Sequence, residues 1–432
     1  MSKVNMMSAK DKKKGSLVPR LRFPEFRDEW TYDNLGDFLE EYSEKVNADT
    51  TLPIYSSTRD GLKAQKDYFN GHELINSGEY GVVPVNCFVY RHMSDDNIFI
   101  FNINLIGGAI AVSKEYPVFK AKNMSPLFLY YILNYGLDFK RFAAMQKKGG
   151  TRTRLYFSTL CSWKTLLPTK PEQQRIADCL SSLDERIAAE TNKLDALKAH
   201  KKGLLKQLFP AEGETLPQLR FPEFQDAGEW EEVPLSKLVS SLDAGVSVNA
   251  GDRPATSEEM GILKTSAVTN GVFEPQENKV VLDVVEIGRM RESVRRNTII
   301  ISRMNTPALV GANAYVDTNF ENIFLPDRLW AAKPKPDTSM RFISFILSSN
   351  QGRATLALSA KGSSGSMKNI TKSDVLAFLA MIPSLPEQQR IAGCLSSLDE
   401  LITAQTQKID LLKDHKKGLM QQLFPCIDEV RA

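Results

Sequence analysis

Apolar residues recur in alternating steps of four and three positions in two 40-residue stretches of the chain, which begin at Pro171 and Pro386. This spacing is typical of a coiled-coil seam held over about five heptads. It predicts two long helices, at 169–210 and 384–425, that pair with each other. The seam residues are Ile176, Leu180, Leu183, Ile187, Leu194 and Leu197 in the first stretch and Ile391, Leu395, Leu398, Ile402, Ile409 and Leu412 in the second.

The two stretches are copies of one another, because 30 of the 40 aligned positions are identical. Polar residues interrupt both seams at corresponding positions, Glu190 and Lys201 in the first and Gln405 and Lys416 in the second. Polar groups at seam positions fix the register and the partner of a coiled coil, so they favour mutual pairing. The alternative is a pair of amphipathic helices that each pack on a separate domain.

The repeat extends beyond the helices. The phrase VPRLRFPEFRDEW, which ends at Trp30, returns as LPQLRFPEFQDAGEW, which ends at Trp230. The middles of the two units share almost no sequence, and each mixes short β-like runs with turn residues and a short helix-like run. We therefore expect an α+β fold with this organisation: a disordered tail at 1–17, a mixed domain at 18–168, a helix at 169–210, a mixed domain at 211–383, a helix at 384–425 and a tail at 426–432.

Composition narrows the possible functions. The 432 residues are 42% hydrophobic and carry a net charge of +3, which is too small by itself to indicate a nucleic-acid partner. No apolar run is long enough to predict a transmembrane helix, and the five scattered cysteines favour a reducing cytoplasm. The sequence has no GxxxxGK[ST] loop, no metal-ligand spacing among its histidines and no Pro-Pro motif of an amino-methyltransferase. These observations argue against intrinsic catalysis.

A basic, glycine-bearing loop precedes each long helix, QKKGGTRTR from Gln146 and AKGSSGSMK from Ala360. Glycine lets backbone amides approach a phosphate, lysine and arginine supply charge, and hydroxyl groups donate hydrogen bonds. A solvated loop is the alternative, but the loops lie at the same distance before both helices. The DNA contacts predicted here are Lys147, Lys148, Thr151, Arg152 and Arg154 in the first loop and Lys361, Ser363, Ser364 and Lys368 in the second.

Three further polar stretches are candidates for contacts to bases or phosphates: YSSTRDGLK from Tyr55, LKTSAVTNG from Leu263 and ISRMNTPALVG from Ile301. Arginine can donate two hydrogen bonds to guanine, and asparagine can pair with adenine in the same way. Each of these residues could equally be an ordinary surface residue. The predicted contacts are Ser57, Arg59, Lys63, Lys264, Thr265, Arg303 and Asn305.

The doubled arrangement resembles the DNA-specificity subunit of Type I restriction-modification systems. The resemblance rests on the paired helices with PEQQRIA, LSSLDE, KKGL and QLFP, on the paired LRFPEF phrases, and on the order domain, helix, domain, helix. The first middle resembles one kind of target recognition domain through YSS from Tyr55 and YPVF from Tyr116. The second resembles another kind through SRMNTP and LVG, although Arg296-Asn297 stands where such domains often carry Gly-Asp.

The resemblance implies two target recognition domains, each followed by a long helix, with the helices pairing as an antiparallel coiled coil of pseudo-twofold symmetry. The domains would read two half-sites of double-stranded DNA, and the helices would set the spacer. This chain would bind no cofactor and no metal. S-adenosylmethionine, ATP and magnesium are expected on its partners, two modification (methyltransferase) subunits and the restriction (motor-nuclease) subunits, with no membrane involved. The alternative function is a structural coiled-coil scaffold whose globular domains bind protein.

Overall fold

The computed structural model describes residues 18–69, 78–362 and 367–424, and it divides into two compact units. Unit 1 consists of Met1–Asn192 and Thr406–Ala432, and unit 2 of Lys193–Gln405. Each unit therefore contains one mixed domain and one end of each long helix. The predicted tails at 1–17 and 426–432 lie outside the described residues.

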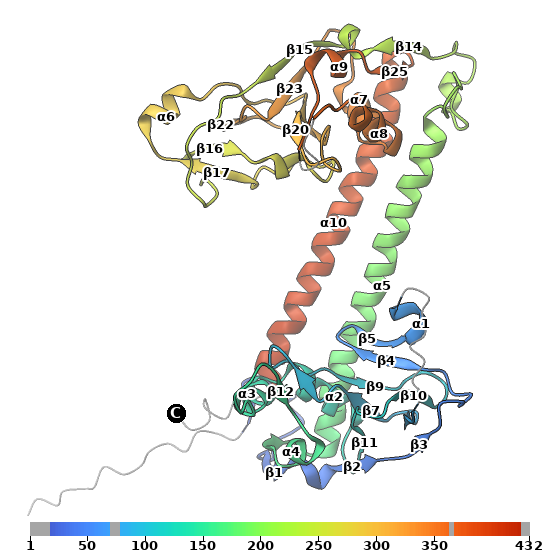
Figure 1. Ribbon diagram of the computed structural model, residues 1–432, viewed down its shortest axis with the longest axis vertical. Coiled ribbons are helices and arrows are strands. Elements are labelled where there is room, and N and C mark those ends of the chain that lie inside the picture. The colour runs from blue at the N-terminus through green and yellow to red at the C-terminus, as the bar shows by residue number, and fades with distance from the viewer. Residues whose placement is uncertain (1–17, 70–77, 363–366, 425–432) are drawn as a thin grey trace, which may run out of the picture. The chain divides into compact units, whose positions relative to one another are not determined.

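Both long helices predicted from the heptad pattern are present (Figure 1). Helix α5 spans Lys170–Leu208, and α10 spans Leu385–Leu423. Proline stands at the second position of each helix, where its missing N–H would have no helical acceptor. None of the helices in the described ranges is long and apolar enough to cross a bilayer.

Unit 1 has a four-stranded antiparallel sheet in the order β2-β11-β7-β9 and a three-stranded sheet β10-β6-β3, with the pairs β1-β13, β12-β8 and β4-β5 beside them. The strands are β1 (Thr31–Asn34), β2 (Leu39–Tyr42), β3 (Lys45–Val46), β4 (Tyr55–Thr58), β5 (Gly61–Ala64), β6 (Tyr80–Val83), β7 (Phe88–Tyr90), β8 (Met93–Ser94), β9 (Phe101–Ile103), β10 (Ile110–Ser113), β11 (Val118–Ala121), β12 (Thr153–Arg154) and β13 (Lys164–Leu167). The short helices are η1 (Leu35–Phe38), α1 (Gln65–Tyr68), α2 (Pro126–Tyr135), α3 (Leu137–Met145) and α4 (Phe157–Cys161).

An aromatic core joins the larger sheet of unit 1 to its helices. The rings of Phe88 and Phe119, from neighbouring strands, stack with centroids 5.1 Å apart. Phe101 meets Phe139 of α3 edge to face at 5.3 Å. All four side chains are fully or almost fully buried. This packing fixes α2 and α3 against the sheet, so the loop that follows α3 starts from a rigid base.

Unit 2 has two four-stranded sheets, β15-β23-β19-β21 and β17-β16-β22-β18, and the pairs β14-β25 and β20-β24. The strands are β14 (Glu231–Pro234), β15 (Val239–Ala244), β16 (Met260–Leu263), β17 (Asn278–Val281), β18 (Ser293–Val294), β19 (Thr298–Ser302), β20 (Met304–Asn305), β21 (Asn313–Val316), β22 (Phe320–Phe324), β23 (Leu329–Pro334), β24 (Lys368–Asn369) and β25 (Leu379–Ile382). The short helices are η2 (Pro222–Phe224), η3 (Leu235–Lys237), η4 (Thr265–Val268), α6 (Val284–Arg289), α7 (Met340–Ser348), α8 (Asn350–Leu358) and α9 (Lys372–Leu376).

One four-stranded sheet, one strand pair and three short helices follow the same order in both units, although the middles of the units share almost no sequence. The order β2-β11-β7-β9 in unit 1 corresponds to β15-β23-β19-β21 in unit 2, and the pair β1-β13 corresponds to β14-β25. Helices α2, α3 and α4 occupy the same places in the order as α7, α8 and α9. The α+β class expected from the sequence is therefore observed in both units, on one shared plan.

The repeated sequence motifs attach each domain to its long helix. Arg22 of the first LRFPEF phrase donates from Nε and Nη2 to the carboxylate of Glu172, at 2.7 Å each. Arg220 binds Glu387 in the same two-pronged way, at 2.7 and 2.8 Å. Both carboxylates are 1% exposed. Since a buried charge is stable only when it is paired, each phrase and each helix start require one another.

The glutamine that follows each of these glutamates completes the attachment. Gln173 accepts a hydrogen bond from the amide of Ser125 at 3.0 Å, and Gln388 accepts one from the amide of Ser339 at 3.2 Å. Each glutamine also donates to the carbonyl of the proline five residues earlier, at 2.9 Å. Ser125 and Ser339 are the N-caps of α2 and α7. The repeated PEQQ motif thus positions the start of α2 in unit 1 and of α7 in unit 2.

The turn before β19, where Arg296-Asn297 replaces the expected Gly-Asp, adopts a left-handed conformation. Asn297 has φ 59°, and Asn86, which precedes β7 at the corresponding place in unit 1, has φ 64°. Asparagine tolerates this region better than most residues with a side chain. The amide of Asn297 donates to Val316 at 2.7 Å, so the turn leads directly into the sheet.

Ion pairs join α5 to α10 within each unit. In unit 1, Lys416 binds Asp184 at 2.5 Å. In unit 2, Lys201 binds Asp399 at 2.5 Å. Lys201 and Lys416 are two of the polar residues that interrupt the predicted seam, and Lys416 is buried, with 7% exposed. The polar positions therefore carry contacts between the helices.

The predicted seam residues differ in burial. The buried ones are Ile176, Leu180, Leu194, Ile391, Leu395 and Ile409; the half-buried ones are Leu183, Ile187, Leu197, Leu398, Ile402 and Leu412. Ile176 and Leu180 join the domain core of unit 1 together with Leu423 from the end of α10. In unit 2, Ile391 and Leu395 share a core with Leu208 from the end of α5. The helix starts therefore pack both on a domain and on the end of the other helix.

Candidate nucleic-acid interface

Two adjoining clefts in unit 1 gather most of the DNA contacts predicted for the first domain. The first cleft has a volume of about 780 Å³ and is lined by Asp95, Gln146, Lys148, Gly149, Gly150, Thr151, Arg152, Arg154, Tyr156 and Thr159. The second has a volume of about 240 Å³, and its lining includes Ser57, Arg59, Arg91, His92, Ser94 and Tyr116. Asp95 and Arg152 line both clefts, so the loop after α3 and the β4-β5 hairpin share one surface.

The glycines of the first loop are required by the backbone. Gly149 has φ 65° and Gly150 has φ 73°, and nothing lies within 4 Å of where a Cβ would stand at either. The space is open, but a side chain there would strain the backbone. Lys147, Lys148 and Thr151 of the same loop are exposed. The loop thus presents cations and a hydroxyl group on a backbone that can approach a phosphate closely.

Two arginines of this surface, Arg152 and Arg59, are paired with carboxylates. Arg152 donates to Asp95 at 2.8 Å, and Arg59 donates to Asp96 at 2.7 Å. The Ser94 hydroxyl and then Arg59 lower the pKa of Asp96, which keeps that carboxylate charged. Exposed ion pairs of this kind contribute only about 0–1 kcal/mol. Both guanidinium groups can therefore exchange their carboxylate for a DNA phosphate or base at little cost.

Lys63 and Ser57 occupy different environments on the β4-β5 hairpin. Lys63 pairs with Asp60 at 2.8 Å near the hairpin turn. Ser57 is only 2% exposed, accepts a hydrogen bond from Asn102 at 2.8 Å and donates to the carbonyl of Val89 at 3.4 Å. Its hydroxyl group therefore serves the fold, although the residue lines the second cleft. Its contact with DNA stays a prediction.

Sequence reasoning missed an aromatic and basic group in the same clefts. The rings of His92 and Tyr156 stack with centroids 5.7 Å apart, and the guanidinium of Arg91 lies 5.9 Å from the ring centre of Tyr116. Tyr156 is 53% exposed. Exposed aromatic rings beside cations suit stacking on bases. The alternation of basic and aromatic residues in YRHM and RLY was the available signal.

The second domain holds Arg303 differently. Its Nε donates to the carbonyl of Asp327 at 2.7 Å, and its guanidinium lies 5.8 Å from the ring centre of Trp330. The ammonium group of Lys372 lies 6.0 Å from the same ring. Asn305 is half-buried, and its side-chain oxygen accepts from the amide of Thr306 at 2.9 Å. Two cations thus meet one tryptophan next to the β20-β24 pair.

The other contacts predicted for unit 2 are dispersed. Lys361 is exposed, and its amide donates to the carbonyl of Asn369 at 2.9 Å. Lys368 donates to the carbonyl of Gly362 at 3.2 Å. Lys264 pairs with Glu277 at 3.4 Å, and Thr265 begins η4 after β16, a strand of the other four-stranded sheet. The predicted residues Ser363 and Ser364 lie outside the described residues.

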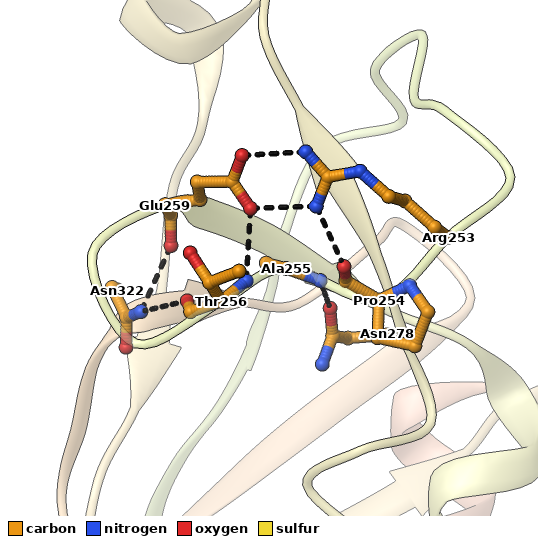
Figure 2. A network of polar contacts seen from close by, with 7 residues as sticks. All are labelled: Arg253, Pro254, Ala255, Thr256, Glu259, Asn278 and Asn322. Atoms are coloured by element: carbon orange, nitrogen blue, oxygen red, sulfur yellow. Dashed lines mark hydrogen bonds and ion pairs between the residues drawn. The ribbon is translucent and has the colours of Figure 1, made fainter. Parts of the chain in front are cut away.

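A polar network fixes the loop that leads into β16 (Figure 2). Arg253 donates to both oxygens of Glu259, at 2.7 and 2.6 Å, and Thr256 donates its amide to the same carboxylate at 2.9 Å. Asn322 donates to the carbonyl of Glu259 at 2.8 Å. Arg253 and the Thr256 amide lower the pKa of Glu259 to about 2. This loop leads into a strand of the sheet β17-β16-β22-β18, whose order differs from that of every sheet in the described part of unit 1.

The sequence matches the model of a known family, Type I restriction modification DNA specificity domain, over residues 94–199 and 229–414. The chain belongs to this family. The match covers more than half of the sequence and includes parts of both domains and both long helices. A DNA specificity chain of this family recognises DNA and is not itself an enzyme, as the sequence predicted.

Relatives and solved structures agree with the family. The chain is 24% identical to the Type I restriction enzyme MjaVIII specificity subunit of Methanocaldococcus jannaschii, over 94% of this chain and 93% of that one. It is 23% identical to the EcoEI specificity subunit of Escherichia coli, over 56% of this chain but only 42% of the relative. The S subunit of a Type I system from M. genitalium matches with a TM-score of 0.58 at 12% identity, over 95% of this chain and 99% of that one. At this identity the structural likeness establishes the fold.

Proposed function

We propose that this chain reads a bipartite DNA target, one half-site per domain, and directs the modification and restriction subunits of a Type I system to it. The observation that carries the proposal is the pair of joined clefts in unit 1, where Lys148, Arg152, Arg154 and Arg59 converge on one surface. Phosphate contacts from such cations supply affinity and position the duplex, while base edges supply sequence choice.

The spacer between half-sites would be set by α5 and α10 as an antiparallel coiled coil. Asp184 and Lys201 of α5 correspond to Asp399 and Lys416 of α10 in the repeat. The contacts Lys416–Asp184 in unit 1 and Lys201–Asp399 in unit 2 are therefore the same contact made twice, with the helices exchanged. This exchange supports antiparallel pairing with pseudo-twofold symmetry. Each helix has 39 residues, a length of about 58 Å.

The catalytic activities are expected on the partner subunits. Two modification (methyltransferase) subunits would carry S-adenosylmethionine, and the restriction (motor-nuclease) subunits would carry ATP and magnesium. The doubled PEQQ and QLFP regions offer two similar surfaces, which suits two copies of one partner. This chain would contribute addressing alone, and the complex would act on cytoplasmic DNA.

The DNA-binding part of the proposal is tested with Arg152→Ala in the full chain assembled with its modification subunit. We expect weaker binding to the target and a smaller salt slope, by about 0.9 in log K against log salt if one phosphate contact is lost. Arg253→Ala is the matched control, because Arg253 is also exposed and paired with a carboxylate but lies in the network of Figure 2. Equal behaviour of the two variants in binding assays at several salt concentrations would contradict the assignment.

The spacer is tested by removing paired heptads. Deleting residues 193–199 from α5 and 401–407 from α10 shortens both helices at positions that face each other in the proposed register. The loss of seven residues shortens the rod by about 10 Å, or about three base pairs. Sequencing of methylated bases should show a target with a correspondingly shorter spacer. An unchanged spacer in an assembled, active complex would remove the ruler from the proposal.

A domain exchange distinguishes recognition of the DNA target from a purely structural scaffold role. Replacing residues 31–150 with the corresponding segment of a relative should change one half-site of the methylated sequence and leave the other intact. If the exchange alters partner binding but not the methylated sequence, the chain acts as a scaffold.

A further inference from the structure

Each domain contains a short two-stranded ribbon built in the same register. The unit 1 ribbon pairs Thr153 with Ser94 and Arg154 with Met93; the unit 2 ribbon pairs Lys368 with Asn305 and Asn369 with Met304. The hydrogen bond that follows each ribbon is also the same: the amide of Leu155 donates to His92 at 2.8 Å, and the amide of Ile370 donates to Arg303 at 2.9 Å. The two ribbons are therefore equivalent positions on one scaffold.

The second strand of each ribbon follows the basic, glycine-bearing loop. Arg154 and Asn369 are separated by 215 positions, the same shift that relates the two long helices. The ribbon lies beside the loop in both units: Arg154 lines the cleft with Lys148 and Gly149, and Asn369 pairs through its backbone with Lys361. Arg154 and Asn369 thus stand at the same point next to the predicted phosphate contacts.

The other polar side chains of the ribbons are bound to neighbouring protein groups. These bonds run from Ser94 to Asp96 at 2.8 Å, from Thr153 to Asn97, from Asn305 to Ser302 at 3.4 Å, and from Lys368 to the carbonyl of Gly362 at 3.2 Å. Within the described ranges, the side chains of Arg154 and Asn369 have no hydrogen-bond or ion-pair partner. The side-chain oxygen of Asn369 is buried and accepts no hydrogen bond from the described residues.

An unpartnered polar group beside the basic loop is available to a partner from outside the chain. A buried polar atom without a hydrogen bond is energetically unfavourable. The oxygen of the Asn369 amide is therefore not held in its observed orientation by a hydrogen bond. Turning it outward breaks no hydrogen bond. The guanidinium of Arg154 is exposed and already borders an open cleft. Both side chains are free to meet the edge of a base.

We propose that Arg154 and Asn369 are equivalent specificity-determining residues, with Arg154 reading guanine in one half-site and Asn369 reading adenine in the other. The planar fork of arginine matches the two major-groove acceptors of guanine, and the asparagine amide matches the acceptor and donor of adenine. A shared ribbon with different side chains at one position lets two domains of one plan read different bases. This inference rests on the proposed DNA-reading function.

The test uses the full chain in complex with its modification subunit and a random pool of duplex DNA, from which bound sequences are selected and sequenced. Arg154→Asn should shift one guanine position of one half-site toward adenine. Asn369→Arg should shift one adenine position of the other half-site toward guanine. The loss of discrimination at each position should be roughly 5- to 150-fold, while the remaining positions are unchanged.

Two further variants separate base reading from other roles. Arg154→Lys keeps the charge but loses the fork, so we expect it to lose the guanine preference and retain most of the affinity. Lys147→Gln should weaken binding to all sequences equally and reduce the salt slope. If the Arg154 variants instead keep the wild-type motif and behave like Lys147→Gln, or if Asn369→Arg leaves its half-site unchanged, the inference is overturned. A wild-type complex that selects no bipartite sequence would overturn the proposed function itself.

Discussion

Unit 1 and unit 2 differ most where they face the proposed DNA and least where each domain meets its helix. His92 and Ser94 in unit 1 stand at the positions of Arg303 and Asn305 in unit 2, within or directly before strands of equal register. The attachment made by Glu172 is instead repeated by Glu387 with the same arginine geometry. Residues that are identical in the two units thus attach each domain to its long helix. Residues that differ between the units, at equivalent places of the fold, are those that the proposed function leaves free to vary with the DNA target.

The attachments are not quite equal. In unit 1, the indole N–H of Trp30 donates to Glu172 at 3.3 Å. In unit 2, the indole N–H of Trp230 is buried and has no partner among the described residues. Glu172 therefore serves two donor side chains and Glu387 serves one. This difference predicts unequal costs for the same substitution in the two units.

The largest effect is expected from Glu172→Ala. Removing one partner of a buried ion pair costs about 3–5 kcal/mol, because the other charge stays buried without compensation. Glu172→Ala also leaves the Trp30 N–H unpaired, so it should cost about 1 kcal/mol more than Glu387→Ala. Urea unfolding of the full chain, followed by circular dichroism, measures both. Glu185→Ala and Glu400→Ala, at exposed corresponding positions on the same helices, are matched controls. Equal costs for the two buried glutamates would show that the indole contact is negligible.

The next effect concerns the lysines between the helices. Lys416 pairs with Asp184 and lies 5.1 Å from the ring centre of Tyr131. Lys201 pairs with Asp399, which also binds Arg341 at 3.0 Å. After Lys201→Ala, Asp399 retains a cationic partner, whereas Lys416→Ala leaves Asp184 without one. We expect a loss of about 2 kcal/mol for Lys416→Ala and about 1 kcal/mol for Lys201→Ala.

Thermal unfolding of the two lysine variants measures this difference. The exposed neighbours Lys202 and Lys417 occupy corresponding positions, so their alanine variants control for the loss of charge and of helix surface. A larger loss of stability for Lys201→Ala than for Lys416→Ala would mean that Arg341 does not compensate the charge of Asp399 once Lys201 is removed.

The sequence predicts the elements of the fold that follow from a short-range repeat of apolar residues. The long helices could be predicted because their seam repeats every few residues. The sheets could not, because pairing of β2 with β11 joins Tyr42 to Val118, and no short-range signal specifies that register. The common strand order of the two domains could not be predicted either, because the sequences of the two middles do not align.

The candidate site was predictable to the same extent. Exposed cations next to glycines, such as Lys148 and Arg152, stand out from composition and spacing. Ser57 looked similar in sequence, but the fold buries its hydroxyl group in bonds to Asn102 and Val89. Asn369 did not stand out because the sequence does not show that it lies on a ribbon built in the same register as the ribbon of Arg154.

A smaller effect is expected at the left-handed turns that both units share. Asn86 and Asn297 have φ 64° and 59°. Replacement by alanine should cost about 1 kcal/mol at either position, because a Cβ is disfavoured there and the asparagine side chain no longer offsets it. Replacement by glycine should change stability by less than about 0.5 kcal/mol, because relief of strain offsets the added freedom of the unfolded chain. Chemical denaturation compares the four variants. A greater loss with glycine than with alanine would show that side-chain contacts dominate these turns.

The smallest effect concerns the loop of unit 2 that leads into β16. Arg253 and the Thr256 amide hold the pKa of Glu259 at about 2, below its ordinary value of 4.5. A carboxylate with a lowered pKa in the folded state contributes stability that is fully present above pH 4.5 and is lost as the pH falls toward 2. Because Glu259 is only half-buried and its partner Arg253 is exposed, we expect a local loosening of the loop at residues 251–259 without global unfolding. Carbon-detected NMR titration of Glu259 measures the pKa directly, and Arg253→Ala should return it toward 4.5. A wild-type titration near 4.5 would show that the network of Figure 2 does not hold this loop in solution.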